Sequence, residues 1–542
     1  MATEQATETV HGGIHVAKAL RSRGVQTLFT LSGGHLFSVY DGCKREDVRI
    51  VDVRHEQAAV FAAEGLAKAT RTPGVAALTA GPGVTNGMSA MAGASFNGSP
   101  VTVLGGRAPS ARWGAGSLQE IDHVPFVEPV VKSAATVQDP AKLARMTAEA
   151  IDACFAAPTG PTFLDYPLDV VFAEAEVDLP DRPEPDRRPA EGVDEAAERL
   201  ASAQRPVIMA GTGLYWAQAE TQLVELAVAR GIPVYVNGLG RGCIPADHDL
   251  AFSRSRRAAL EGADVALVVG APLDFRLGFG DSFGDDTTVI RIGSAPNDKG
   301  TRDPDMDLVG DVAATLSVLL EGAGEAPDAT GEWLGSLGET EREKVEGDKE
   351  QLADARSPLH PMRVYAELNQ VLDRETIVIG DGGDFVSYAG RMIDTYNPGC
   401  WMDPGPYGCL GGGPGQAIGA AVARPDRPIC LLLGDGAFGF SGMEFDTMAR
   451  HGLPIVGVMG NNGIWALEKH PMEALYGYSV AAELEQSPYH RVVEALGCDG
   501  VCVSEPDELR PALENAFESG RPTLVNVLTD PEVAYPRSSN LA

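Results

Sequence analysis

The feature that most constrains the fold is the alternation of short, largely apolar runs with alanine-rich stretches long enough to form helices. Runs of this kind occupy residues 27–31, 49–53, 75–79, 101–104, 206–210, 265–269, 376–379 and 429–433, and one helix is expected at residues 56–70. Runs that are apolar throughout are typical of parallel strands covered by helices on both faces. The alternation therefore predicts repeated βα units and an α/β fold with doubly wound parallel sheets.

Two polar stretches divide the chain into three blocks. One is proline-rich and covers residues 179–192, and the other is charged and helix-prone and covers residues 321–356. We predict domains at residues 1–180, 193–340 and 361–542, joined by linkers at residues 181–192 and 341–360. A chain of 542 residues is long enough for three domains of ordinary size. In such units, ligands bind at the carboxyl ends of the strands.

The charge balance excludes several classes of partner. The chain has 43 Lys and Arg against 76 Asp and Glu, a formal net charge of −33. So acidic a surface repels phosphate backbones and anionic lipids, so we expect neither a nucleic-acid nor a membrane partner. No apolar run approaches the roughly 20 residues that a membrane-spanning helix needs. A small anionic substrate remains compatible with this charge, because a few local cations are enough to bind it.

Cysteine usage and the N-terminus both favour a cytoplasmic protein. The eight cysteines are scattered without CxxC spacing, which predicts reduced thiols and neither a disulfide framework nor a zinc site. Residues 1–10 lack the basic and apolar regions of a signal peptide, so we expect none.

The most informative motif is Gly434-Asp435-Gly436, followed after 25 residues by Asn462. Asp435 and Asn462 each follow an apolar run, so both are expected at the carboxyl ends of buried strands. Two such ends in one parallel sheet place a carboxylate and an amide oxygen around one cation, and Mg²⁺ prefers oxygen ligands completed by substrate phosphates. The glycines allow a diphosphate to approach the backbone, and a helix expected to start near Met443 would direct its N-terminus at it.

This motif resembles the signature of thiamine diphosphate enzymes. The order of the three blocks is similar, along nearly the whole chain, to the acetolactate synthase-like family, large catalytic subunit. The resemblance implies pyrimidine-binding, central Rossmann-like and diphosphate-binding domains, with thiamine diphosphate and Mg²⁺ as cofactors. It implies a homodimer at minimum and a homotetramer as the full assembly, with each cofactor site shared by two subunits. Its implied metal ligands are Asp435, Asn462 and the carbonyl of Ile464.

The resemblance also assigns a role to Glu56, in the segment Arg54-His55-Glu56. A carboxylate bonded to N1′ of the aminopyrimidine favours the imino tautomer, whose N4′ can take the proton from C2 of the thiazolium ring. The alternative is an ordinary carboxylate in the first turn of a helix, stabilised by the helix dipole. The residues implied to bind the cofactor are Glu56, Gly83, Asp384, Phe385, Gly408, Leu410, Gly434, Asp435, Gly436, Ala437, Asn462, Ile464 and Trp465.

Four of these residues have specific expected contacts. Leu410 would support the bent cofactor, and the Gly408 carbonyl would accept a hydrogen bond from N4′. Asp384 falls, with Phe385, where relatives contact the diphosphate, although an aspartate beside an anion is unusual.

Two residues bear on the reaction. Gln119 lies in a segment, residues 116–120, that acetolactate synthases, 2-hydroxyacyl-CoA lyases and benzaldehyde lyases share, and its amide can donate a hydrogen bond to a carbonyl or hydroxyl of the cofactor adduct. His35 lies at a strand-to-helix turn where benzaldehyde lyases also have histidine and typical acetolactate synthases have a small residue. A neutral imidazole there suits proton transfer near pH 7. A capping or core histidine is the alternative interpretation.

The central block leaves its ligand open. Its segments are similar to those of 2-hydroxyacyl-CoA lyases and oxalyl-CoA decarboxylases, whose central domain holds an adenine nucleotide as ADP or CoA, whereas acetolactate synthases hold FAD there. An empty central domain is the third case. The residues that would bind phosphates are Arg241, Arg254, Arg256 and Arg276.

We predict a thiamine-dependent carbon–carbon ligase or lyase with a small-molecule substrate. The first hypothesis is acetolactate synthase-type condensation of 2-oxo acids through a thiamine-bound carbanion, a transferase reaction. The alternative is a 2-hydroxyacyl-CoA lyase that releases formyl-CoA and an aldehyde or ketone, or the reverse carboligase reaction. A nucleotide sensor with an inactive catalytic site is a non-enzymatic third hypothesis.

Overall fold

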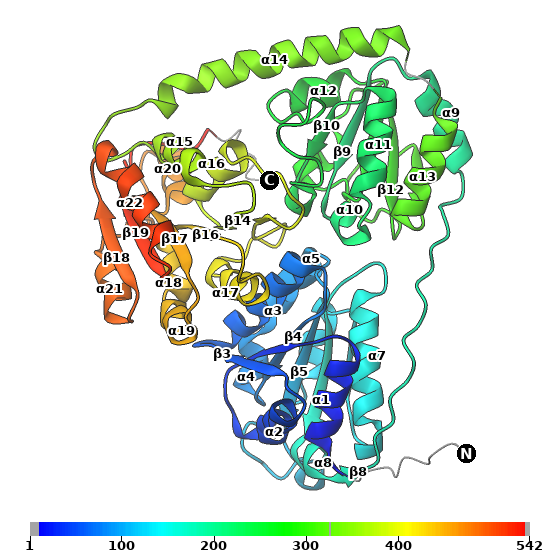
Figure 1. The fold of residues 1–542 in the computed structure, drawn as a ribbon, viewed down its shortest axis with the longest axis vertical. Coiled ribbons are helices and arrows are strands. Elements are labelled where there is room, and N and C mark those ends of the chain that lie inside the picture. The colour runs from blue at the N-terminus through cyan, green and yellow to red at the C-terminus, as the bar shows by residue number, and fades with distance from the viewer. Residues whose placement is uncertain (1–9, 325–326, 537–542) are drawn as a thin grey trace. The chain divides into compact units, whose positions relative to one another are not determined.

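The computed structural model of the chain describes residues 10–324 and 327–536. The prediction that residues 1–10 form no signal peptide concerns mainly residues 1–9, which lie outside the described residues. Three parallel sheets with helices between their strands confirm the predicted α/β fold (Figure 1). By contacts, the chain forms two compact units. One comprises the residues up to Glu184, Ile377–Val386 and the residues from Asp403 on, and the other comprises Pro185–Thr376 and Ser387–Met402.

The N-terminal sheet has the strand order β3-β2-β4-β5-β7-β6, and all its pairs are parallel. Its strands are β2 (Thr27–Thr30), β3 (Arg49–Asp52), β4 (Gly74–Leu78), β5 (Val101–Arg107), β6 (Ser133–Thr136) and β7 (Thr162–Pro167). Its helices are α1 (Gly12–Ser22), α2 (Phe37–Arg45), α3 (Glu56–Thr70), α4 (Pro82–Asn86), α5 (Met88–Phe96), α6 (Val124–Val127), α7 (Leu143–Phe155) and α8 (Leu168–Phe172). A short antiparallel pair, β1 (Val10–His11) and β8 (Glu174–Ala175), closes the domain. Apolar side chains of α1, α2 and α7 form its core with the strands.

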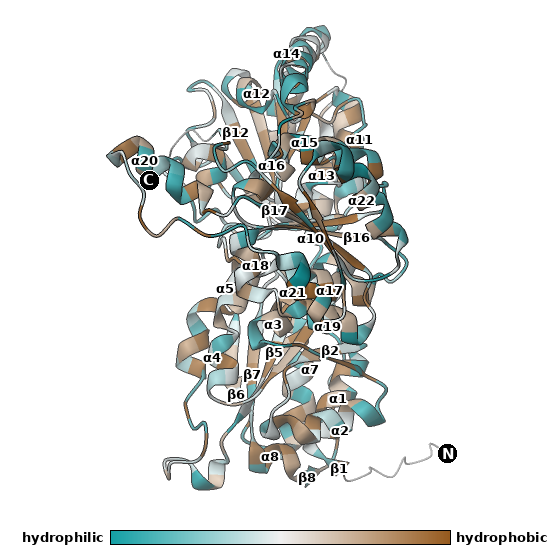
Figure 2. Ribbon diagram, turned by 90° about the vertical axis from the view of Figure 1, so that its left-hand side faces the viewer, coloured by the Kyte–Doolittle hydropathy of each residue, from teal (hydrophilic) through white to brown (hydrophobic). Residues whose placement is uncertain are grey.

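From β14 onward, the strands of the C-terminal sheet follow the order β14-β16-β17-β19-β18, and each of these pairs is parallel. Its strands are β14 (Ile377–Asp381), β16 (Ile429–Gly434), β17 (Ile455–Asn461), β18 (Asp499–Val503) and β19 (Thr523–Leu528). Its helices are α17 (Gly413–Ala423), α18 (Asp435–Ser441), α19 (Glu444–His451), α20 (Ala466–Tyr476), α21 (Tyr489–Ala495) and α22 (Pro506–Glu518). Figure 2 shows β16 and β17 as strongly hydrophobic strands, as their apolar sequences predict.

A short helix that the sequence did not predict starts at the glycine motif. α18 starts at Asp435 itself, and Gly434 precedes it with extended backbone at φ −85° and ψ 162°. A carboxylate in a first helical turn is favoured by the helix dipole, which suits Asp435 to this position. The helix predicted to start near Met443 is confirmed as α19, which starts at Glu444. That its N-terminus is directed at the diphosphate stays a prediction.

Helices α3 and α17 join the two sheets within the first unit. They approach closely because glycines replace side chains between them: a Cβ on Gly65 would lie 2.2 Å from the Gln416 carbonyl oxygen, and one on Gly419 would lie 1.9 Å from that of Ala62. A fully buried ion pair, Glu64 to Lys68 at 3.0 Å, lies along the same contact, where Glu64 also accepts a hydrogen bond from the Gln416 amide.

The second unit contains the central sheet, with the order β10-β9-β11-β12-β13 in parallel. Its strands are β9 (Pro206–Ala210), β10 (Val234–Val236), β11 (Val265–Val269), β12 (Thr288–Gly293) and β13 (Met306–Val309). Its helices are α9 (Val193–Ser202), α10 (Thr212–Ala217), α11 (Glu220–Arg230), α12 (Arg256–Gly262) and α13 (Val312–Gly322). Buried apolar clusters lie on both faces of the sheet. Residues 176–190, where a linker is expected, form no helix or strand.

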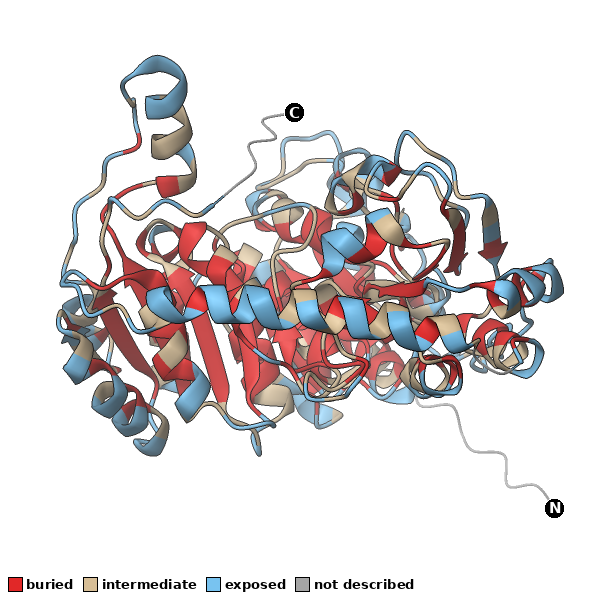
Figure 3. Ribbon diagram, turned by 90° about the horizontal axis from the view of Figure 1, so that it is seen from above, coloured by how far each residue is buried: buried red, intermediate tan, exposed pale blue. Residues whose placement is uncertain are grey.

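A long charged helix follows the central sheet. α14 (Asp328–Leu352) runs without interruption through residue 340, where we place the end of the central domain, and Figure 3 shows that most of its surface is exposed. α15 (Pro361–Val371), α16 (Asp384–Met392) and the short strand β15 (Trp401–Met402) come next. Within the described residues, no helix combines the length and the apolar character that crossing a membrane requires.

Candidate active site

The carboxyl ends of β16 and β17 bring Asp435 and Asn462 together, as the motif predicts. The two strands are parallel neighbours, with Gly434 opposite Gly460. One Asp435 carboxylate oxygen accepts the Gly463 N–H at 3.1 Å, and the Asn462 side-chain oxygen accepts the Ile464 N–H at 3.2 Å. Both side chains are buried.

Asp384 completes this cluster from the start of α16. Its carboxylate accepts a hydrogen bond from the Asn462 side-chain nitrogen at 3.3 Å. An aspartate is unusual beside a diphosphate, but this one contacts Asn462, an expected metal ligand, which accounts for a carboxylate at this position. Burial, together with the charge of Asp384, raises the pKa of Asp435 to about 7, although backbone N–H groups lower it. Burial also raises the pKa of Asp384.

The donor set of the cluster fits a Mg²⁺ ion. Two buried carboxylates repel each other, and a bound cation would offset the cost of ionising both. A carboxylate, an amide oxygen and a backbone carbonyl are the hard oxygen ligands that Mg²⁺ takes alongside phosphates. Among the described residues, no group of three or more His, Cys, Asp and Glu side chains is arranged to hold a metal, so an ion here would rely on the amide and carbonyl oxygens as well.

Two glycines leave space for aromatic rings beside the cluster. A Cβ on Gly436 would lie 2.6 Å from the Trp465 ring, and one on Gly460 would lie 2.3 Å from the Phe385 ring. Glycine at these positions therefore lets two aromatic rings pack against the strand ends. Ala437, next to Gly436, is buried within α18.

A buried aspartate that sequence analysis missed holds the loop with Gly408 and Leu410. Asp381, at the end of β14, accepts the N–H groups of Gly411 at 2.9 Å and Gly413 at 3.1 Å. It is fully buried, and burial raises its pKa to about 7. Its neighbour Gly382 leaves room for Leu410, whose side chain would otherwise lie 2.1 Å from a Cβ. Its signal in the sequence was an aspartate directly after an apolar strand, the same pattern that identified Asp435.

At the N-terminal sheet, Glu56 is the first residue of α3 and is buried. Asn86, the last residue of α4, donates a hydrogen bond to its carboxylate at 3.1 Å. Sequence analysis missed Asn86, because nothing in the spacing indicates that the end of α4 meets the start of α3. The predicted helix at residues 56–70 is confirmed, and the His55 ring caps it by accepting the Gln57 N–H at 3.1 Å.

His35 lies close to the loop that contains Gly83. Its Nδ1 lies 3.2 Å from the Thr79 hydroxyl, and a Cβ on Gly83 would lie 2.8 Å from the Thr79 methyl group. A Cβ on Gly106 would lie 2.4 Å from that of His35, so this glycine admits the histidine. Burial lowers the pKa of His35, and the neighbouring His123 lowers it further, which favours a neutral imidazole at pH 7.

Gln119 lies against Gly81, whose backbone is held by a buried network of side chains. Gln119 has a positive φ of 60°, unusual for a residue with a side chain, and a Cβ on Gly81 would lie 2.9 Å from its own. The fully buried His123 accepts the Gly81 N–H through Nε2 at 2.9 Å, so its proton lies on Nδ1, which donates to Asp165 at 2.9 Å. Arg107 donates to the same Asp165 carboxylate at 2.9 Å.

The arginines expected to bind a nucleotide in the central domain are largely committed elsewhere. Arg241 donates to the carbonyls of Gly390 and Ile393 and stacks on Trp401. Arg254 is paired with Asp348 at 3.2 Å, and Arg276 is paired with Asp274 at 2.7 Å. Arg256 is the first residue of α12. The phosphate-binding role predicted for Arg241, Arg254 and Arg276 does not fit these contacts.

Comparison with known proteins places the chain in a family. It matches "Thiamine pyrophosphate enzyme, N-terminal TPP binding domain" at residues 10–126, the central domain of the same family at 193–319 and the C-terminal TPP binding domain at 381–527. It is 56% identical to acetolactate synthase large subunit IlvG of Mycobacterium tuberculosis over 100% of both chains. It is 33% identical to 2-hydroxyacyl-CoA lyase 2 of Bos taurus, over 96% of this chain and 90% of that protein. The chain belongs to the family of thiamine pyrophosphate enzymes.

Proposed function

We propose that this chain is the catalytic large subunit of an acetolactate synthase-type enzyme, which condenses 2-oxo acids with the help of thiamine diphosphate and Mg²⁺. The observation that carries this proposal is the 56% identity, over the full length of both chains, with a protein named as an acetolactate synthase large subunit. Identity with the lyase relative is 33%. When bound, thiamine diphosphate supplies a nucleophilic carbon that attacks the substrate carbonyl.

Each group of residues has a distinct part in this proposal. Asp435, Asn462 and the Ile464 carbonyl hold Mg²⁺, and the strand-end glycines leave room for the diphosphate. Glu56 holds a proton at N1′ of the aminopyrimidine, with its carboxylate oriented by Asn86. Leu410, on the loop held by Asp381, supports the bent cofactor, and the Gly408 carbonyl accepts from its amino group. Gln119 and His35 orient the substrate carbonyl.

We also propose that the enzyme is at least a homodimer, and a homotetramer in full, in the cytoplasm. Apolar side chains near the site are exposed in the single chain, including Leu118 at 81% and Phe440 at 61%. Exposed apolar groups beside functional residues favour a second subunit that covers them. None of the eight cysteines forms a disulfide, which suits a reducing compartment.

The alternative function is the 2-hydroxyacyl-CoA lyase, which the second group of relatives and a neutral His35 favour. Purified protein should be assayed for acetolactate from pyruvate and for formyl-CoA from a 2-hydroxyacyl-CoA. Acetolactate formation supports the proposal, and formyl-CoA without acetolactate overturns it in favour of the lyase. If neither product forms although the cofactor is bound, the nucleotide-sensor hypothesis is favoured.

A second measurement addresses the central domain. Mass spectrometry of ligands released from the purified protein distinguishes FAD, which the synthase proposal favours, from ADP or CoA, which the lyase alternative favours.

A further inference from the structure

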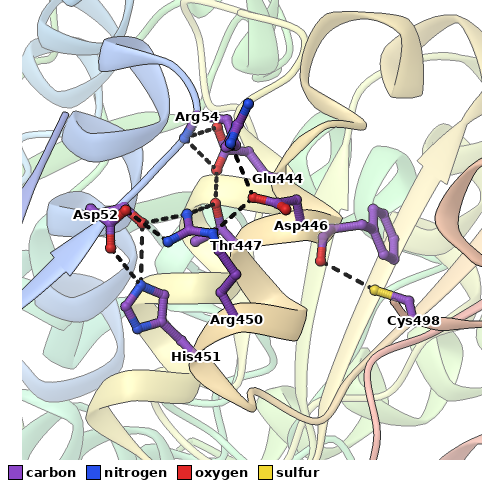
Figure 4. Close-up of polar contacts among 9 residues, drawn as sticks. Asp52, Arg54, Glu444, Asp446, Thr447, Arg450, His451 and Cys498 are labelled. Atoms are coloured by element: carbon purple, nitrogen blue, oxygen red, sulfur yellow. Dashed lines mark hydrogen bonds and ion pairs between the residues drawn. The ribbon is translucent and has the colours of Figure 1, made fainter. Parts of the chain in front are cut away.

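A buried carboxylate of the C-terminal domain holds the backbone next to Glu56. Glu444, the first residue of α19, is 1% exposed. Its two oxygens lie 3.1 and 3.2 Å from the backbone nitrogen of Arg54, whose N–H donates to them, and the Thr447 hydroxyl donates to it at 2.7 Å. The His55 N–H also donates to this carboxylate. Figure 4 shows Glu444 between the Arg54 backbone and Thr447.

The neighbouring contacts between α19 and the end of β3 are ion pairs between side chains. Arg54 pairs with Asp446 at 3.5 Å, and Arg450 pairs with Asp52 at 2.7 Å and with Asp446 at 2.8 Å (Figure 4). His451 lies 3.1 Å from Asp52. These side chains are partly exposed, and ion pairs of this kind contribute little to stability. They join α19 to the end of β3, where Arg450 also donates to the Asp52 backbone carbonyl at 3.1 Å. Glu444 instead binds a backbone N–H two residues before Glu56.

Burying Glu444 is costly. Desolvation raises its pKa to about 7, although Thr447, the two backbone N–H groups and the charge of Arg450 lower it. An apolar side chain of similar size would fill the same space without that cost. A carboxylate offers what an apolar group does not, namely two acceptor oxygens for the N–H groups that precede the first turn of α3.

We propose that Glu444 is a positioning residue for Glu56: by binding the turn at Arg54 and His55, it sets where α3 begins and therefore where the Glu56 carboxylate lies. Because Glu56 is the first residue of the helix, a rotation of that turn would displace its side chain directly. Asn86 holds the carboxylate itself, and Glu444 holds the backbone from which it extends. The inference rests on the proposed function, since it assigns Glu56 the cofactor-activating role.

The test compares two substitutions on one helix. Glu444→Gln keeps the size of the side chain and replaces charge-assisted hydrogen bonds by neutral ones, which are about half as strong. Asp446→Asn is the matched control, because it weakens the Arg54 side-chain pair and leaves the backbone contact unchanged. In full-length protein with thiamine diphosphate and Mg²⁺ bound, the measurements are the exchange rate of the cofactor C2 proton and hydrogen–deuterium exchange of the peptide covering residues 54–58.

We expect Glu444→Gln to slow C2-proton exchange by roughly tenfold, as a loss of about 1.4 kcal/mol would, and to speed amide exchange in residues 54–58. Asp446→Asn should change neither. In the Glu56→Gln background, adding Glu444→Gln should slow C2-proton exchange no further, because a residue that acts through Glu56 has nothing left to position. Glu444→Ala, where it folds, should show a larger effect in the same direction.

The outcomes separate this inference from the proposed function. Wild-type C2-proton exchange in Glu444→Gln, alongside a strong loss in Glu56→Gln, overturns the positioning role alone. An additive loss in the double variant also overturns it. Unchanged C2-proton exchange in Glu56→Gln, with the cofactor bound, overturns the proposed function itself.

Discussion

The N-terminal and C-terminal sheets share a topology but differ in the polar groups at their carboxyl ends. Five strands of each follow the same order, β2-β4-β5-β7-β6 in one and β14-β16-β17-β19-β18 in the other. The C-terminal sheet presents buried carboxylates, Asp384 and Asp435, with the Asn462 amide between strand ends. The N-terminal sheet has His35 and Gln119 beside its glycine turn and the Glu56 carboxylate next to the Asn86 amide. A further buried carboxylate there, Asp165, is already paired with Arg107 and His123.

The difference shows that topology supplies the place of a site and the side chains decide its chemistry. Parallel strands end at one edge in both domains, so polar residues after them converge. Two carboxylates in close proximity favour a cation, whereas one carboxylate and a neutral imidazole favour proton handling. The C-terminal edge is therefore suited to binding the metal and diphosphate, and the N-terminal edge to activating the cofactor.

The largest effect is expected from Glu56, the residue to which we assign activation of the cofactor. Glu56→Gln should lower turnover by roughly 10³-fold or more, at the upper part of the range for acid–base groups, while Mg²⁺ and thiamine diphosphate still bind. The amide cannot favour the imino tautomer as a carboxylate does. Steady-state kinetics and calorimetric titration of the cofactor measure the two parts. Wild-type turnover with the cofactor bound would contradict the thiamine assignment.

The second prediction tests whether the two edges of one site come from different subunits. Glu56→Gln and Asp435→Ala subunits, each inactive alone, should recover about a quarter of wild-type activity after random exchange, because half of the dimers are mixed and each has one intact site. The control is an exchange between two differently tagged Glu56→Gln preparations, which should stay inactive. Absence of recovery, with mixed dimers proven by mass spectrometry, would show that each chain builds its own site.

The third prediction concerns a smaller effect, the pH dependence of stability that the buried Asp381 of the C-terminal domain causes. Burial raises the pKa of Asp381 to about 7, so its folded form retains a proton that the unfolded chain releases near its ordinary pKa. Its stabilising contribution is full below about pH 4 and is lost progressively as the pH rises from there to about 7. Within that window, one such group lowers the melting temperature by about 3–5 °C per pH unit, and above pH 7, where folded and unfolded chains are both ionised, it has no further effect.

Asp381→Asn should therefore show a shallower fall in melting temperature between about pH 5 and 7 in metal-free protein. Some slope should remain, since burial also raises the pKa of Asp435 and Glu444 to about 7. Asp426→Asn, with a side chain 69% exposed on the same domain, is the control and should keep the wild-type slope. Equal slopes in Asp381→Asn and wild type would remove Asp381 from this account.

The sequence was most informative where a residue directly follows a buried strand. Asp435 and Asn462 were predictable because their apolar runs fix them at one sheet edge, and the helix at residues 56–70 has the predicted bounds. Asn86 and Glu444 were not, because both act on α3 from helices whose packing no local pattern encodes. α18 was missed because Asp-Gly more often marks a turn than the first residues of a helix.

The smallest effect on the proposed reaction is expected at His35, and it decides between the two reaction classes. Condensation of 2-oxo acids starts with loss of CO₂, which leaves its electron pair behind and requires little proton transfer from the protein. His35→Ala should then leave pyruvate decarboxylation within a few-fold of wild type and change mainly KM or the choice of acceptor.

Cleavage of a 2-hydroxyacyl compound instead requires its hydroxyl to lose a proton as the carbon–carbon bond breaks. The neutral imidazole of His35, whose pKa burial lowers, is a suitable base, and its loss would slow cleavage by roughly 10²–10⁴-fold. Assays of both reactions on wild type and His35→Ala, at matched cofactor saturation, separate the cases. A variant unchanged in both assays, in acceptor choice as well as rate, would leave His35 as a half-buried turn histidine that packs against Thr79 and Gly106.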